Sequence, residues 1–187
     1  MVALNKKVPD MELHAFHKDQ IRKIKLSDYK GKWLAVVFYP GDFTFICPTE
    51  LGELANNYDR FKAVGAEVLS VSTDSVYTHK AWRDVSQTVA RIKFPMIADP
   101  GGRMAREFGV YIDDEGVALR GSFVIDPDGV LKAYEIHDND IGRSTKELLR
   151  KVQAAKFVRE NKGQVCPANW EMGDKPLKKS LDLVGKL

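Results

Sequence analysis

Cysteine is scarce in this chain of 187 residues, which contains only Cys47 and Cys166, far apart in the sequence. No C-x-x-C pair is present, so dithiol exchange within one short motif is excluded. A cysteine of an intracellular protein most often fills space in the core. In a reducing compartment, two cysteines with a function are more often catalytic or redox-sensing than a static cross-link.

Long apolar runs and blocks of like charge are also lacking. No stretch approaches the roughly 18 to 20 apolar residues of a membrane span, and the N-terminal residues do not resemble a targeting signal, so we expect a cytoplasmic protein without a membrane anchor. The 29 basic and 26 acidic residues are spread along the chain, which argues against a nucleic-acid partner. His14 and His17 lack a third ligand, so neither a metal nor another cofactor is predicted.

The stretch around Cys47 changes its period from strand to helix. The apolar run from Leu34 to Tyr39 ends at Pro40 and Gly41, as a buried strand does. From Leu51 to Val64 the apolar residues recur at helical spacing. Between the two elements lies Cys47, and Pro48 suits the first turn of a helix.

A cysteine at this position meets the N-terminus of a helix. The free N–H groups and the positive end of the helix dipole favour a thiolate over a thiol. Thr44 lies three residues upstream, close enough for its hydroxyl to donate to the sulfur. Because a strand-to-helix junction is a surface site, the pattern favours an accessible nucleophile over a space-filling cysteine.

The remaining periodicities predict the other elements. They are a strand over 67–72, a helix capped by Ser75 and continuing to Val89, a strand over 94–98, a short helix over 102–108, a hairpin of 121–125 and 130–136, and a helix from the capping box at Ser144 to Val158. With short β-prone pieces in residues 1–32, this order predicts an α/β, thioredoxin-like fold with an N-terminal β addition. Residues 1–160 are expected to form the domain, and residues 161–187 a C-terminal extension that carries Cys166.

Several motifs resemble those of one family. Pro40, Thr44 and Cys47 have the spacing P-x-x-x-T-x-x-C, followed by P-T-E, and Cys166 lies in the segment V-C-P-A before Trp170. These motifs resemble the typical 2-Cys peroxiredoxins, in particular the C subunits of bacterial alkyl hydroperoxide reductases. Further matches at 78–82, 126–129 and 180–186 extend the resemblance over almost the whole chain.

The resemblance implies a thiol peroxidase that reduces hydrogen peroxide and small organic hydroperoxides in antioxidant defence and redox homeostasis. Cys47 would be the peroxidatic nucleophile and would become a sulfenic acid. Cys166 would be the resolving cysteine and would form an intersubunit disulfide in an antiparallel homodimer. Because disulfide geometry is strict, we expect the first turn around Cys47 to unwind on oxidation.

Further site residues follow from the same resemblance. Thr44 would hydrogen-bond the thiolate or the peroxide, Pro40 would shield the sulfur from water, and Arg120 would supply a permanent positive charge. Glu50 and Arg143 resemble supporting residues.

The resemblance also implies partners. The disulfide would be reduced by a flavoprotein disulfide reductase or by thioredoxin, and the residues leave this choice open. Dimers of the family often assemble into decameric rings, and Phe43, Tyr77 and Thr78 lie in segments that resemble the ring interface. The segment 83–94 lacks Gly-Gly-Leu-Gly, and the chain ends at Leu187 without a Tyr-Phe extension. We therefore expect resistance to overoxidation.

Two other functions are compatible with parts of the pattern. One is a holdase chaperone or redox-signalling scaffold that acts through its oligomeric surface. The other is a general disulfide oxidoreductase, which the missing C-x-x-C disfavours. His79 and Trp82 share one face of the predicted helix, and we interpret them as packing residues because no nucleophile lies near the histidine.

Overall fold

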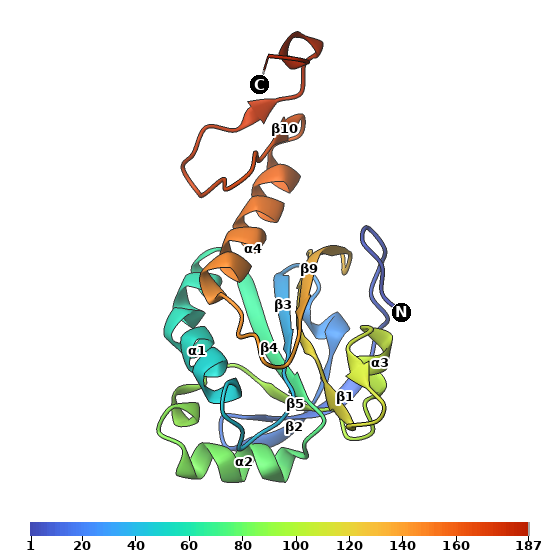
Figure 1. Ribbon diagram of the computed structural model, residues 1–187, viewed down its shortest axis with the longest axis vertical. Helices are drawn as coiled ribbons and strands as arrows, with labels where there is room; N and C mark the ends of the chain where they lie inside the picture. Colours follow the sequence, from blue (N-terminus) through green and yellow to red (C-terminus); the bar gives the residue numbers. More distant parts are fainter. Residues whose placement is uncertain (187) are drawn as a thin grey trace.

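A seven-stranded sheet forms the centre of the computed structural model, which describes residues 1–186 (Figure 1). The strand order is β2-β1-β5-β4-β3-β8-β9; β3, β4 and β5 are parallel, and the other pairs are antiparallel. The strands are β1 Glu12–His17, β2 Gln20–Lys25, β3 Trp33–Phe38, β4 Ala66–Ser72, β5 Met96–Ala98, β8 Arg120–Ile125 and β9 Leu131–His137. The predicted α/β, thioredoxin-like fold with an N-terminal β addition is confirmed.

Helices cover both faces of this sheet. The α-helices are α1 Cys47–Ala63, α2 Val76–Val85, α3 Arg103–Glu107 and α4 Thr145–Glu160. The short 3-10 helices are η1 Leu26–Tyr29, η2 Val89–Arg91 and η3 Leu181–Leu183. Two small antiparallel pairs are formed by β6 Tyr111–Ile112 with β7 Val117–Ala118 and by β10 Gln164–Val165 with β11 Leu177–Lys178. The helices α1, α2 and α4 pack on one face, and α3 packs on the other.

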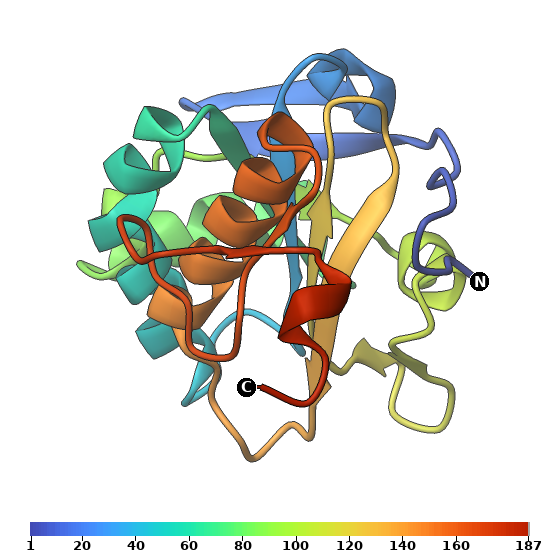
Figure 2. The same ribbon diagram turned by 90° about the horizontal axis from the view of Figure 1, so that it is seen from above.

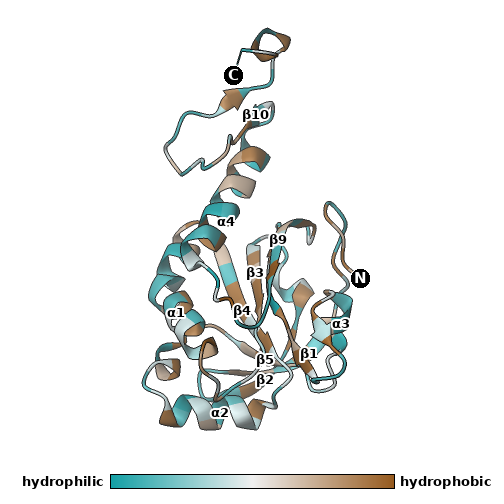
Figure 3. Cartoon of the chain, viewed as in Figure 1, coloured by the Kyte–Doolittle hydropathy of each residue, from teal (hydrophilic) through white to brown (hydrophobic). Residues whose placement is uncertain are grey.

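Strand β3 separates two hydrophobic cores. Trp33, Ala35 and Val37 face the core beneath α1 and α4, whereas the alternating residues Leu34 and Val36 face the core beneath α3. Every residue of β3 is buried, as expected for a central strand with both faces covered. Figure 3 shows hydrophobic residues concentrated on the central strands.

Several element boundaries differ from those predicted, among them the end of α2 and the starts of β5 and α1. Helix α2 ends at Val85, and Val89 belongs to the separate turn η2, because Ser86 is extended and its hydroxyl accepts the Val89 N–H at 3.3 Å. Strand β5 begins at Met96, after Pro95, whose missing N–H limits sheet pairing. Helix α1 begins at Cys47 itself, with Pro48 in its first turn.

The chain after α4 folds back along that helix. Figures 1 and 2 show α4 projecting from the body with the last segment around its far end. The rings of Trp170 and Phe157 lie 4.9 Å apart, and Arg150 donates to the Trp170 carbonyl at 3.1 Å. These contacts attach residues 161–186 to α4; the division into a domain and a tail stays a prediction. Among the described residues, the helices are all too short or too polar to cross a membrane.

Candidate active site

Strand pairing brings the predicted site residues together at one end of the sheet. Because β3 and β8 are antiparallel, with Val37 opposite Ser122, the beginning of β8 lies beside the end of β3. Arg120 is the first residue of β8, and Cys47 is the first residue of α1, the helix that follows β3. Arg143 lies just before α4. Residues distant in sequence therefore converge where β3 ends.

A guanidinium lies against the sulfur of Cys47. The Arg120 Nη1 donates to Sγ at 3.4 Å, and the Arg120 Nε donates to the Asn139 carbonyl at 2.9 Å. Arg120 is 3% exposed, so solvent screens its charge only weakly at the sulfur. The permanent positive charge predicted beside Cys47 is thus in place.

Glu50 joins the two arginines of the site. Its Oε2 accepts Nη1 of Arg120 and Nη2 of Arg143, each at 2.8 Å. Its Oε1 accepts the backbone N–H and the Nε of Arg143 at 2.7 Å and 2.9 Å. Burial acts to raise the pKa of Glu50, but the hydrogen bonds and charge of Arg143, together with the charge of Arg120, outweigh burial and lower this pKa. Glu50 is therefore a buried carboxylate that fixes both guanidinium groups.

Arg143 also fastens this network to the sheet. Its Nη1 donates to the Gly121 carbonyl at 2.8 Å and to the Ser122 hydroxyl at 3.2 Å. The side chains of Arg143 and Glu50 are 4% and 5% exposed. The orientation of Arg120 is thus held by groups from α1, β8 and the start of α4.

The expected surface position of Cys47 is wrong. Its side chain is 0% exposed and belongs to the core beneath α1. The reason is local packing: Cys47 belongs to the same hydrophobic core as Val37 and Leu51, and Arg120 from β8 contacts its sulfur. Thr44 is exposed, and its hydroxyl donates to the Gly41 carbonyl at 2.9 Å instead of to the sulfur. Pro40 is half-buried and opens this loop.

Cys166 lies far from these residues within one subunit. Arg143 contacts Glu50 just before α4 begins, whereas Cys166 follows the end of this helix of 16 residues, which is about 24 Å long at 1.5 Å per residue. The Cys166 Sγ lies 3.8 Å from the Ala154 carbonyl, on the second half of α4. Both cysteines are free thiols. Burial raises the pKa of Cys166, and the charge of Arg150 opposes this effect.

Sequence reasoning missed a second buried cluster beside the site. His79 is fully buried, as predicted for a packing residue, but both of its ring nitrogens have polar partners, Asp42 and the Ile97 carbonyl. Tyr39 contributes a hydroxyl to the same carboxylate. The sequence holds one signal of this cluster, the histidine on an apolar helix face. Such a histidine is expected to be buried, and a buried imidazole requires hydrogen-bond partners.

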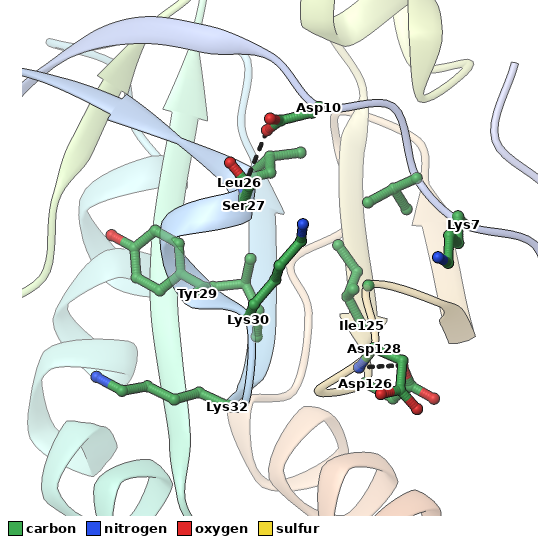
Figure 4. A pocket seen from close by; sticks show the side chains of 13 residues that line it. Lys7, Asp10, Leu26, Ser27, Tyr29, Lys30, Lys32, Ile125, Asp126 and Asp128 are labelled. Atoms are coloured by element: carbon green, nitrogen blue, oxygen red, sulfur yellow. Dashed lines mark hydrogen bonds between the residues drawn. The ribbon is translucent and has the colours of Figure 1, made fainter.

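A separate cavity lies away from the cysteines. Its volume is about 190 Å³, with Leu34 and Ile125 in its lining and Lys7, Asp10 and Lys30 around it (Figure 4). Neither cysteine is among its lining residues. No group of three or more histidine, cysteine or acidic side chains with metal-binding geometry occurs within residues 1–186.

Comparison with known proteins places this geometry among thiol-dependent enzymes. Residues 4–134 match the AhpC/TSA family, and residues 154–187 match the family described as the C-terminal domain of 1-Cys peroxiredoxin. The chain is 46% identical over 187 residues to alkyl hydroperoxide reductase C of Pseudomonas aeruginosa and 47% identical over 189 residues to that of Staphylococcus aureus, with 100% of both chains covered in each case.

Solved structures agree with these relatives. The crystal structure of AhpC from Enterococcus faecalis superposes with a TM-score of 0.86 at 46% identity, covering 89% of this chain and 100% of that chain. The reduced 2-Cys peroxiredoxin of Plasmodium vivax superposes with a TM-score of 0.91 at 32% identity, covering 96% and 94%.

Proposed function

Because the chain belongs to the AhpC/TSA family and is a 2-Cys peroxiredoxin, a thiol-based antioxidant peroxidase, we propose that Cys47 is the residue that attacks the peroxide. The observation that carries this assignment is the Arg120 guanidinium 3.4 Å from the Cys47 sulfur. A thiolate is the nucleophilic form of cysteine, and a buried fixed cation stabilises it. Hydrogen peroxide and small organic hydroperoxides are the proposed substrates.

In the first step the thiolate attacks the terminal oxygen of the hydroperoxide. The O–O bond breaks, an S–O bond forms, and the leaving oxygen departs with the electron pair and takes a proton to become water or an alcohol. The sulfur is oxidised to sulfenic acid as the peroxide is reduced. Arg120 is placed to stabilise charge on both oxygens. Thr44 and Pro40 would orient the peroxide and exclude water once the loop 40–46 adjusts to the substrate.

In the second step the Cys166 thiolate attacks the sulfenic sulfur, an S–S bond forms, the S–O bond breaks, and the departing hydroxide takes up a proton to become water. We infer that the attacking cysteine comes from another subunit. The supporting observation is the position of Cys166 beside Ala154, ten residues into α4 and thus about 14 Å beyond the helix start, where Arg143 contacts the Cys47 site of the same chain. Bonded cysteines have Cα atoms only about 4.4 to 6.8 Å apart, so Cys47 must also leave its buried position.

The homodimer and its partners belong to the same proposal. Strand β9 is an edge of the sheet, and Tyr134 and Ile136 on it are 48% and 38% exposed, a surface suited to pairing with a second copy. Phe43 and Tyr77, which are 56% and 73% exposed, are proposed contacts in a decameric ring. A dithiol protein, either a flavoprotein disulfide reductase or thioredoxin, would return the disulfide to two thiols, which suits a reducing cytoplasm.

Mixing two single-cysteine variants tests both cysteine roles. Cys47→Ser retains only Cys166, and Cys166→Ser retains only Cys47. After co-refolding and one equivalent of peroxide, we expect a covalent dimer on non-reducing electrophoresis, with a Cys47–Cys166 peptide on mass spectrometry. Neither variant alone should give this peptide. A wild-type protein that forms the disulfide within one chain, or a Cys47→Ser variant that still consumes peroxide, would contradict the proposal.

A further inference from the structure

A buried hydrogen-bonded cluster lies next to the loop 40–46 and has no part in the chemistry assigned to Cys47. The Nδ1 of His79, on α2, lies 2.7 Å from Oδ2 of Asp42, and the Tyr39 hydroxyl donates to Oδ1 of the same carboxyl group at 2.7 Å. The side chains of His79 and Asp42 are 0% exposed. The cluster thus ties α2 to the segment that leads into Cys47.

The hydrogen bonds of His79 define the charge of this pair. Its Nε2 lies 3.2 Å from the Ile97 carbonyl, which can only accept, so Nε2 carries a hydrogen. One further proton lies between Nδ1 and the Asp42 carboxyl group. Burial raises the pKa of Asp42, and the hydrogen bond and charge of His79 oppose this rise. Because the two side chains share one proton, the pair has no net charge, and its complete burial costs less free energy than burial of a single charge.

The backbone of the loop is held at the same place. The Asp42 N–H donates to Oδ2 of Asp74 at 2.8 Å, and that oxygen also accepts the Ser72 hydroxyl at 2.7 Å. The next residue, Phe43, has φ +56°, a left-handed conformation that bulky side chains rarely adopt. Its ring lies 6.0 Å from that of Trp82, on α2. The loop therefore keeps a strained conformation through contacts with α2 and the end of β4.

We propose that Asp42 and His79 are positioning residues that hold the loop 40–46 in its observed, closed conformation, in which Cys47 is buried, and that they set the balance between this closed loop and an open one. This inference rests on the proposed function, because it takes Cys47 as the peroxide-reactive residue. The closed loop keeps Pro40 and Thr44 near Cys47, so that a small adjustment of the loop brings them to the peroxide. The open loop frees the sulfur for the resolving cysteine. Loss of the pair should therefore slow the first step and speed the second.

The two steps can be timed separately by rapid mixing with peroxide, with tryptophan fluorescence as the signal. In Asp42→Ala we expect the peroxide phase to slow by about tenfold or more, because small displacements of positioning groups are costly. The disulfide phase should become faster, and iodoacetamide should alkylate Cys47 faster. In Asp42→Asn both phases should stay within about twofold of wild type, since the amide can accept from Tyr39 and donate to Nδ1 of His79.

Asp126→Ala is the matched control. Asp126 is also a buried aspartate, 7% exposed, but it lies in the β8–β9 turn and accepts the Asp128 and Val130 N–H groups. Its loss should lower stability without the opposite shifts of the two phases. If Asp42→Ala does not fold, His79→Asn provides the same comparison and should give the same opposite shifts.

The outcomes separate the two levels of inference. Three outcomes would overturn the role of the pair while leaving the function of Cys47 intact. In Asp42→Ala both phases could change in the same direction, this variant could behave like Asp126→Ala, or Asp42→Asn could fail to restore the wild-type rates. A wild-type protein with no peroxide phase would overturn the proposed function itself.

Discussion

Two buried arginines at the site share a single carboxylate. Arg120 and Arg143 each donate to Glu50, so these three side chains carry one net positive charge in a region that solvent hardly reaches. An unbalanced buried charge is costly. The sulfur of Cys47 lies 3.4 Å from Arg120, so the thiolate proposed above would supply the missing negative charge. The site is therefore electrostatically complete when the sulfur is ionised.

Removing the guanidinium beside the sulfur tests this charge balance. For Arg120→Ala we expect the second-order rate constant with hydrogen peroxide to fall by about 100-fold or more, as for the loss of one preorganised donor to an oxyanion. Competition kinetics against a peroxidase of known rate measures this constant. Arg106→Ala is the control, because Arg106 forms an exposed pair with Asp113. A less than threefold change in Arg120→Ala would refute this role of the residue.

The lowered pKa of Glu50 predicts acid sensitivity. The folded protein favours the Glu50 carboxylate more than the unfolded chain does, so this residue stabilises the fold at every pH above its ordinary pKa of 4.5. This stabilisation is lost as the pH falls from 4.5 through the lower pKa that Glu50 has in the folded protein. Glu50→Gln should be less stable at pH 7 by about 1.5 to 3 kcal/mol. Its Tm should also fall less than that of wild type on acidification below 4.5. Calorimetry against the exposed control Glu53→Gln checks both expectations, and parallel Tm curves would contradict the second.

At the scale of elements, α4 and the segment after it carry Cys166, the proposed resolving cysteine, as one unit. Trp170 is 2% exposed and packs against Phe157, and Arg150 contacts the Trp170 carbonyl. These contacts keep Cys166 half-buried on α4, and burial raises its pKa. Cys166 is therefore a thiol at neutral pH and must lose a proton before it attacks the sulfenic acid.

This protonation state predicts that disulfide formation accelerates as pH rises. Because the pKa of Cys166 is raised above its ordinary value of 9.0, its thiolate fraction is small at pH 7. This fraction grows as the pH approaches and passes 9.0. In rapid mixing after one equivalent of peroxide, the disulfide phase should become steadily faster as pH is raised from 7 toward 9. A rate that stays flat over this interval would show that deprotonation of Cys166 does not limit the step.

The elements differ in how well the sequence predicts them. Strand β3 and helix α1 were predicted closely because a continuous apolar run defines the strand, apolar residues at helical spacing define the helix, and Pro40 and Pro48 lie next to the end of one and the start of the other. The hairpin β6–β7 was not predicted, since strands of two residues have no measurable period. The partners of His79 were not predictable either, because Asp42 reaches it only through tertiary packing.

The site was predicted unevenly for a similar reason. Arg120, Glu50 and Arg143 were found through motif resemblance, and the structure places all three together around Cys47. Burial of the sulfur was not predicted, because exposure depends on the core that packs around Cys47 and on Arg120, which comes from a distant strand. Local signals indicate which residues react, whereas their accessibility is decided by long-range contacts.

At the scale of the whole molecule, Cys166 lies beside the second half of α4, away from the Cys47 site at the start of that helix, and the sheet has an edge at β9. Both features favour a second copy of the chain as the source of the resolving cysteine. Ile136, 38% exposed on β9, is part of the proposed contact.

A charge on this edge should weaken the dimer. For Ile136→Lys we expect a larger monomer fraction in analytical ultracentrifugation and slower disulfide formation on dilution, because a like charge then faces itself across the twofold contact. Val85→Lys is a matched control, since Val85 is 73% exposed on α2, away from β9. An unchanged dimer in Ile136→Lys would place the contact elsewhere.

Trapping the sulfenic acid tests the reactivity of Cys47 most directly. The Cys166→Ser variant is treated with one equivalent of hydrogen peroxide in the presence of dimedone, and the modified residue is identified by mass spectrometry. We predict one dimedone adduct per chain, at Cys47, and a much lower yield in the double variant that also carries Arg120→Ala. Absence of an adduct at Cys47, with peroxide still consumed, would contradict the assignment.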